Sequence, residues 1–243
     1  MLASLKRKDI LILLVFSTLF FLFQHYFVLS WDFSTYVINA QYWFDNGSYL
    51  ESLRPPLMSL IIGLFSFLGW NIAELCYVGL VSILFCISSV KLAKALKFNP
   101  FFFYALSLSG YVLLVGLWNG TELLSLVLLE FAIVFILKGN SFSGLFLALS
   151  ALTRYTALFF FPILFLHLNL KKILKSLVLF SLPLILWFSY NYFTYGNFFS
   201  SIANIYANNV VYRHYVHQAP NLLDFLGVIG ILLPFFIVGI ILV

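Results

Sequence analysis

The sequence predicts an all-α polytopic membrane protein, a bundle of about eight transmembrane helices with further helices in the extracytoplasmic interface. Composition is the first reason: 63% of the 243 residues are hydrophobic and only 9% are charged, too few to cover a water-soluble surface. The second reason is that apolar runs of membrane-spanning length, about 20 residues each, recur from Ile10 to the last residue. A soluble globular domain is therefore excluded, and a single transmembrane domain is expected over residues 1–243.

The basic residues predict how the chain is oriented. Lys6, Arg7 and Lys8 directly precede the first apolar run, residues 10–29, and the positive-inside rule places this N-terminal end in the cytosol. Residues 30–70 then form a first external loop, with helices in the membrane interface. Because the formal net charge of +5 arises from short clusters between apolar runs, it indicates topology, and we expect no nucleic-acid partner.

Residues 55–70 are the one apolar run that we expect not to cross the membrane. The run is short and opens with a double proline. If it crossed, Lys91, Lys94 and Lys97 would lie outside, against the charge rule. If residues 55–70 lie in the outer interface instead, these three lysines are cytosolic, in agreement with the charge rule. The later spans are then residues 72–90, 101–117, 123–137, two short helices between Lys138 and Lys171, 173–193 and 222–243.

The stretch between Lys138 and Lys171 is expected to be split because of Arg154. One continuous helix would hold Arg154 near the bilayer centre, at a cost of about 2.5 kcal/mol or more. Two short or tilted helices place it at the outer side, and residues 194–221 then form a second large external loop. Ten of the thirteen basic residues become cytosolic. The external ones are all arginines, whose fork of donors suits a phosphate: Arg54, Arg154 and Arg213.

Asp32 is the leading catalytic candidate. Within residues 31–44, apolar side chains follow helical spacing on one face while Asp32, Thr35 and Asn39 share another. This pattern is typical of a helix that lies on the membrane with a polar stripe toward a cavity. A carboxylate at this boundary could act as a general base toward an acceptor hydroxyl, or could bind a metal that does so. The alternative is that Asp32 is only a helix N-cap.

Other polar residues leave similar alternatives open. Glu122 could be a second acid of the site or an acidic residue favoured at a helix N-terminus. His214 and His217 could be ligands or acid/base groups, or plain surface residues of an aromatic loop. Glu130 lies deep in an expected span and should face other helices. No phosphate-binding loop or dinucleotide fingerprint occurs, so no nucleotide cofactor is expected and a lipid-carried substrate fits better.

Several short motifs occur together in the first expected loop: Trp31-Asp32, Tyr36, Ala40, Asn46-Gly47, Tyr49 and Arg54-Pro55-Pro56-Leu57. This combination resembles the first external loop of the GT-C class of membrane glycosyltransferases. It is most similar to the dolichyl-phosphate-mannose protein mannosyltransferase and aminoarabinose transferase group, in which an acidic residue is followed by Lys-Pro-Pro-Leu. Arginine replaces that lysine here. Residues 144–155 also resemble that family's small-residue helix, which ends in a basic residue.

The resemblance implies a GT-C-type bundle and an enzyme that transfers a sugar from a polyprenyl-phosphate donor to a protein or lipid-linked glycan acceptor at the extracytoplasmic face. Asp32 would be the catalytic carboxylate and Glu122 the second acid, a position that is often Asp in the mannosyltransferase group. The three external arginines would bind the carrier phosphate, and a divalent metal, if one is used, would bind Asp32 and Glu122. Further acceptor or donor contacts are expected from Tyr36, Asn39, Tyr155, His214 and His217.

The rival hypothesis is a non-catalytic membrane protein with the same fold, such as a lipid transporter or an assembly subunit. A transporter should show paired half-helices in two repeated halves, and the sequence contains no such repeat. Larger members of the GT-C class use later segments for acceptor binding, so a C-terminal part could be missing from this chain.

Labelling of single cysteines tests the expected orientation, after both native cysteines have been replaced. A cysteine at Gly120 should react with a membrane-impermeant thiol reagent added from outside. A cysteine at Lys94 should react only after the membrane has been opened. Labelling with the opposite sidedness would place the loop before Glu122 in the cytosol and contradict the external site.

Overall fold

The computed structural model describes residues 7–28 and 30–208, and within these ranges every regular element is a helix. The all-α prediction is therefore confirmed for the described part. The chain divides into two compact units, residues 1–201 and 202–243. The expected span over residues 222–243 and three candidate site residues lie outside the described residues: Arg213, His214 and His217.

Among the described residues, three helices are long and apolar enough to cross a membrane: α1 (Arg7–Phe27), α4 (Trp70–Ala95) and α9 (Leu170–Tyr195). At about 1.5 Å per residue, the 21 residues of α1 extend about 32 Å and the 26 residues of α4 and of α9 extend about 39 Å. These lengths match a hydrocarbon core of about 30 Å. The three helices coincide with three predicted spans and indicate association with a membrane.

The expected span over residues 101–117 is two short helices, which differs from the prediction. They are α5 (Pro100–Ser107) and α6 (Gly110–Val115). The physical reason is local, because Ser109 acts as the N-cap of α6 and accepts a hydrogen bond from the backbone N–H of Val112 at 3.4 Å. A capping serine favours a new helix start over continuation of the preceding helix.

The remaining elements are also shorter than the three long helices. They are α2 (Trp31–Phe44), α3 (Leu57–Leu64), η1 (Ser66–Leu68), α7 (Thr121–Leu137), α8 (Ser143–Thr153), η2 (Tyr155–Leu166) and α10 (Ser200–Tyr206). As predicted, the helix before Arg154 ends at that residue. As expected for residues 55–70, α3 is too short to cross, since eight residues extend only about 12 Å.

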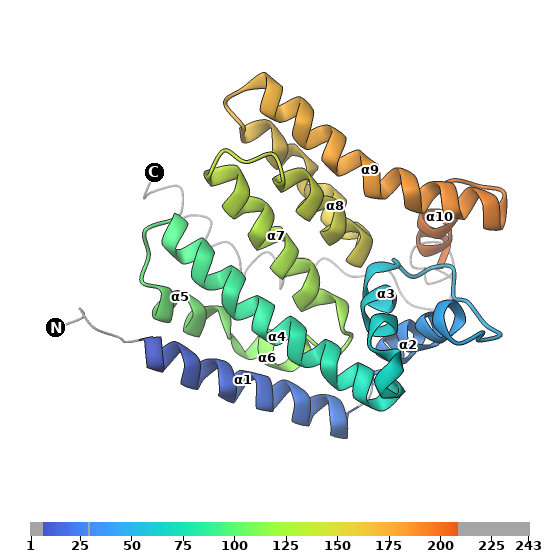
Figure 1. The fold of residues 1–243 in the computed structure, drawn as a ribbon, viewed down its shortest axis with the longest axis horizontal. Coiled ribbons are helices and arrows are strands. Elements are labelled where there is room, and N and C mark those ends of the chain that lie inside the picture. Colours follow the sequence, from blue (N-terminus) through green and yellow to red (C-terminus); the bar gives the residue numbers. More distant parts are fainter. Residues whose placement is uncertain (1–6, 29, 209–243) are drawn as a thin grey trace, which may run out of the picture. The chain divides into compact units, whose positions relative to one another are not determined.

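Figure 1 shows the main helices following one another side by side in the order α1, α4, α7, α8 and α9, with α2 and α3 beside the end of the helices at which α4 begins. Hydroxyl groups join neighbouring helices inside the row. Glu130 of α7 accepts hydrogen bonds from Ser88 at 2.5 Å and from Ser89 at 3.1 Å, both on α4. Glu130 thus faces another helix, as predicted, and its partners are serines rather than a cation.

Small residues let α8 and α9 approach closely. Gly144 of α8 lies against the backbone carbonyl of Ser176 on α9, and a Cβ atom at Gly144 would overlap that oxygen. Ser143 also joins the contact through hydrogen-bond distances of 3.3 Å to the Ser176 hydroxyl and 2.8 Å to Nε2 of His167. Such contacts between small side chains are typical of helix packing in membranes.

Replacement of Gly144 by alanine should therefore destabilise the protein, by about 1–3 kcal/mol, because a backbone atom cannot move aside without separating two helices. The matched control is Gly79→Ala in α4, where a Cβ atom would meet nothing within 4 Å. That control should be neutral or up to about 1 kcal/mol more stable, since alanine favours a helix over glycine. Thermal unfolding in detergent measures both. Equal stability of the two variants would contradict the close packing of α8 on α9.

Candidate functional site

Asp32 lies in the first turn of α2, and its carboxylate bonds to an arginine from the following loop. Ser30 occupies the N-cap position of α2, so the N-cap alternative for Asp32 is wrong. Oδ1 of Asp32 accepts a hydrogen bond from Nη2 of Arg54 at 2.6 Å. The carboxylate also lies where the helix dipole favours negative charge. The Arg54 hydrogen bond and the N-terminal end of α2 therefore both stabilise the Asp32 carboxylate.

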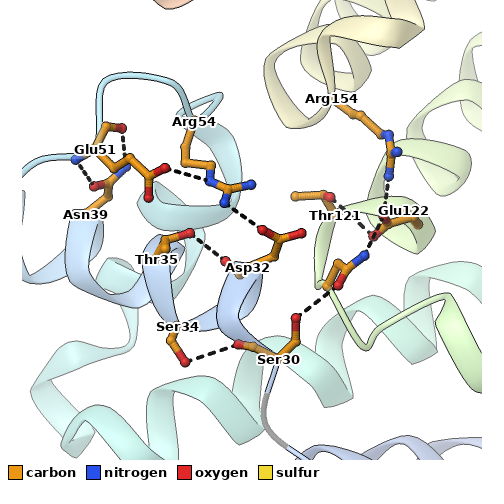
Figure 2. Close-up of polar contacts among 11 residues, drawn as sticks. Ser30, Asp32, Ser34, Thr35, Asn39, Glu51, Arg54, Thr121, Glu122 and Arg154 are labelled. Atoms are coloured by element: carbon orange, nitrogen blue, oxygen red, sulfur yellow. Dashed lines mark hydrogen bonds and ion pairs between the residues drawn. The ribbon is translucent and has the colours of Figure 1, made fainter. Parts of the chain in front are cut away.

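The loop that carries Arg54 is fastened to α2 by Asn39. The side-chain amide of Asn39 donates to the carbonyl of Glu51 at 3.0 Å, and its oxygen accepts from the Glu51 backbone N–H at 2.7 Å (Figure 2). Glu51 in turn lies 3.5 Å from Nε of Arg54. Asn39 stays a predicted acceptor or donor contact, and in the structure its side chain supports this loop.

Tyr36 of α2 also contacts Arg54, through its aromatic ring. The guanidinium carbon lies 5.5 Å from the centre of the Tyr36 ring, within the range of a cation–π contact. Burial raises the pKa of Tyr36 well above its ordinary value, although the charge of Arg54 acts in the opposite direction. Tyr36 is therefore a neutral phenol throughout the physiological pH range. It also lies close enough to Asp32 and Glu122 to be affected by both charges.

Glu122 lies in the first turn of α7 and is paired with Arg154. The turn before α7 requires Gly120, whose φ of +87° is in the left-handed region and whose carbonyl accepts a hydrogen bond from the Tyr77 hydroxyl at 2.6 Å. Asn119 and Thr121 contact the Glu122 carboxylate at 3.2 Å and 3.3 Å. Nη1 of Arg154 donates to Oε1 of Glu122.

Arg154 can reach Glu122 because the chain leaves its helical path there. α8 ends at Thr153, and the backbone of Arg154 is extended with φ −152° and ψ 114° before η2 begins. The predicted break at Arg154 thus has a direct structural effect. It turns one side chain out of a helix and toward the start of α7.

A hydrogen bond joins the start of α2 to the loop before α7, because the Ser30 hydroxyl donates to Oδ1 of Asn119 at 2.9 Å, and Asn119 in turn donates to Glu122. Figure 2 shows the resulting arrangement, in which α2 and its following loop carry one ion pair and the start of α7 with Arg154 carries the other. We name this set the two-acid cluster. It consists of Ser30, Asp32, Arg54, Asn119, Glu122 and Arg154.

The two ion pairs differ in which partner is accessible. In the first pair the Asp32 side chain is 41% exposed and the Arg54 side chain 21%. In the second pair the Arg154 side chain is 43% exposed and the Glu122 side chain 20%. The cluster therefore offers one accessible carboxylate, which can accept a proton, and one accessible guanidinium, which can bind an anion.

Tyr155, another predicted acceptor or donor contact, lies among aromatic side chains. Tyr155 accepts a hydrogen bond from the indole N–H of Trp187 at 2.7 Å, and Trp187 stacks on Tyr190 with ring centres 5.2 Å apart. Trp43 of α2 donates to the Tyr190 hydroxyl at 3.1 Å. Tyr155 thus belongs to an aromatic cluster directly after Arg154. In the described part of the chain, no three His, Cys, Asp or Glu side chains gather where they could hold a metal ion.

Sequence reasoning missed Ser30, Asn119 and Glu51 as parts of the site. The spacing of Glu51 and Arg54, three residues apart, was a usable signal for an ion pair. Ser30 and Asn119 gave no such signal, since 89 residues separate them. Comparisons with protein-family models, characterised proteins and solved structures found no match to this chain.

Proposed function

We propose that the chain is a GT-C-type glycosyltransferase with about eight transmembrane helices. In this proposal it transfers a sugar from a polyprenyl-phosphate donor to a protein or lipid-linked glycan acceptor at the extracytoplasmic face. The observation that carries the proposal is the two-acid cluster, with its accessible Asp32 carboxylate and its accessible Arg154 guanidinium. Sugar transfer from a lipid phosphate needs these two groups, because the acceptor loses a proton while the leaving phosphate gains negative charge.

Asp32 acts as the general base in this mechanism. The acceptor oxygen attacks the anomeric carbon of the donor, the bond from that carbon to the phosphate oxygen breaks, and the acceptor proton passes to Asp32. Arg54 binds Oδ1, so Oδ2 is the oxygen that receives the proton. The hydrogen bond from Arg54 orients the carboxylate before each transfer.

Arg154 stabilises the leaving phosphate. Arginine has five N–H donors, and the bond from Nη1 to Glu122 leaves further donors on the accessible side of the guanidinium. Bidentate contacts of this kind strengthen as negative charge grows on the phosphate. Glu122 holds Arg154 in place, and Arg213 remains a predicted third contact.

The second candidate is a non-catalytic assembly subunit or lipid transporter, and one observation favours it. Arg54 and Arg154 are each already paired with a carboxylate. A purely structural network would contain the same pairs, one between α2 and its following loop and one between Arg154 and the start of α7. Buried or half-buried ion pairs also occur for structural reasons alone. Turnover by the purified protein separates the two candidates.

Asp32→Asn is expected to lower sugar transfer at least about 100-fold, because an amide cannot take up the acceptor proton. Stability should change by less than about 1 kcal/mol, since the amide oxygen can still accept from Arg54 and the Asp32 side chain is 41% exposed to water. The measurement is release of free polyprenyl phosphate from a panel of polyprenyl-phosphate hexoses in the presence of acceptor-containing membranes. The control is Asp45→Asn at the other end of α2, where the carboxylate accepts a hydrogen bond from the Trp70 indole at 3.1 Å. Full activity of Asp32→Asn would remove the catalytic role.

Arg154→Lys is expected to raise the KM for the lipid donor about tenfold, because lysine restores the charge without the two parallel donors. An arginine that only reaches toward the interface would tolerate lysine with little loss. Arg213→Lys is the matched comparison, and we expect it to be the more tolerant variant. Normal donor kinetics for Arg154→Lys would contradict the phosphate contact.

A further inference from the structure

We propose a second ligand site in this protein, a groove between α1 and α4 that binds a phospholipid with an anionic headgroup. The groove has a volume of about 1200 Å³, and its lining residues in the described part of the chain all belong to these two helices. None of its lining residues belongs to the two-acid cluster, and the inference does not depend on sugar transfer.

The groove lies where the start of α1 meets the end of α4. The two helices pack side by side in opposite directions (Figure 1). At the other end of the pair, His25 near the end of α1 contacts Glu74 near the start of α4 at 3.0 Å. This fixes the direction of both helices, so the lysine-rich ends of α1 and α4 lie together.

Three exposed lysines line one end of the groove: Lys8 of α1, and Lys91 and Lys94 of α4. Lys91 and Lys94 are three residues apart and therefore share one face of α4. Nζ of Lys91 also lies 5.5 Å from the ring centre of Phe131 on α7. This distance is within the range of a cation–π contact, which restrains the position of the Lys91 ammonium group. Asp9, which follows Lys8 in the sequence, is not among the lining residues.

The rest of the lining is apolar: Ile10, Leu11, Leu14, Cys86, Ile87 and Val90. Leu14 lies six residues beyond Lys8, about 9 Å along the helix, and Cys86 lies eight residues before Lys94, about 12 Å along the helix. The apolar walls therefore extend from the cations along both helices in the same direction. An anionic headgroup with an acyl chain matches both parts, whereas a free phosphate matches only the lysines.

Charge complementarity favours a lipid over a second copy of this chain. A symmetric contact through the groove would bring two sets of the same three lysines together, and like charges at an interface oppose association. The positive-inside rule predicts that this end of α1 and α4 lies in the cytosol, where the membrane leaflet carries anionic lipids.

The experiment compares the retention of added phosphatidylglycerol and phosphatidylcholine by the purified protein, using native mass spectrometry after titration in detergent. The test variant is Lys8→Gln/Lys91→Gln/Lys94→Gln. The control is Lys138→Gln/Lys171→Gln/Lys175→Gln, which removes the same charge from exposed lysines of the same predicted side that do not line the groove. We expect the test variant to bind phosphatidylglycerol on the order of 100-fold more weakly and the control to bind it like the wild type. An equal loss in both variants would show general surface attraction and overturn the site.

Ile87→Trp tests the apolar wall without changing any charge. Ile87 is 39% exposed, so a larger side chain can enter the groove without disturbing the core. We expect phosphatidylglycerol retention to fall about tenfold, while glycerol 3-phosphate should not compete for the site in the wild type. Normal retention by Ile87→Trp, effective competition by glycerol 3-phosphate, or a dimer in place of the lipid adduct would each overturn the proposal.

Discussion

The pairing of charged side chains at one end of an apolar helix bundle is the constraint on which the rest of this structure depends. An arginine or a carboxylate removed from water needs a partner, and a pair that loses one partner leaves an uncompensated charge. Arg154 leaves its helix and meets Glu122 at the start of α7. Arg54 meets Asp32 at the start of α2. The bond from Ser30 to Asn119 then connects the start of α2 to the loop before α7, next to both pairs.

Inside the bundle, a charged side chain finds hydroxyl groups as partners in place of an opposite charge. Glu130 has no cation beside it among the described residues, and hydroxyl groups of Ser88 and Ser89 satisfy its carboxylate instead. Serine pairs also join α7 to α8, where the hydroxyls of Ser125 and Ser150 lie 2.9 Å apart. Small polar side chains allow helices to pack closely while leaving no polar group without a partner at these contacts.

The ion pairs also determine what the two-acid cluster can do. A pair in which both partners were fully buried would only hold the structure together. Here each pair leaves one partner accessible, a carboxylate in the first and a guanidinium in the second. The less exposed partner orients the accessible one, which reduces the rearrangement needed when a substrate arrives.

The sequence by itself determined the features that depend on hydropathy and on local chain signals. These are the all-helical class, the long apolar helices α1, α4 and α9, the short non-crossing helix after the double proline and the break at Arg154. Each follows from the energy of placing a given segment in an apolar environment, which is nearly independent of the neighbouring helices. Ser109, the capping serine that divides residues 101–117, was also a local signal. The prediction of one span there rested on the length of the apolar run and gave this signal too little weight.

Only the tertiary structure decided which polar groups meet. Asp32 and Glu122 could be recognised as candidates, yet their separate partners, Arg54 and Arg154, lie 22 and 32 residues away in the sequence. The link from Ser30 to Asn119 spans 89 residues. Apolar helices can pack against one another in many orders, because their surfaces are alike. The order in which they pack therefore selects the charge pairs, and the composition of each helix does not reveal it.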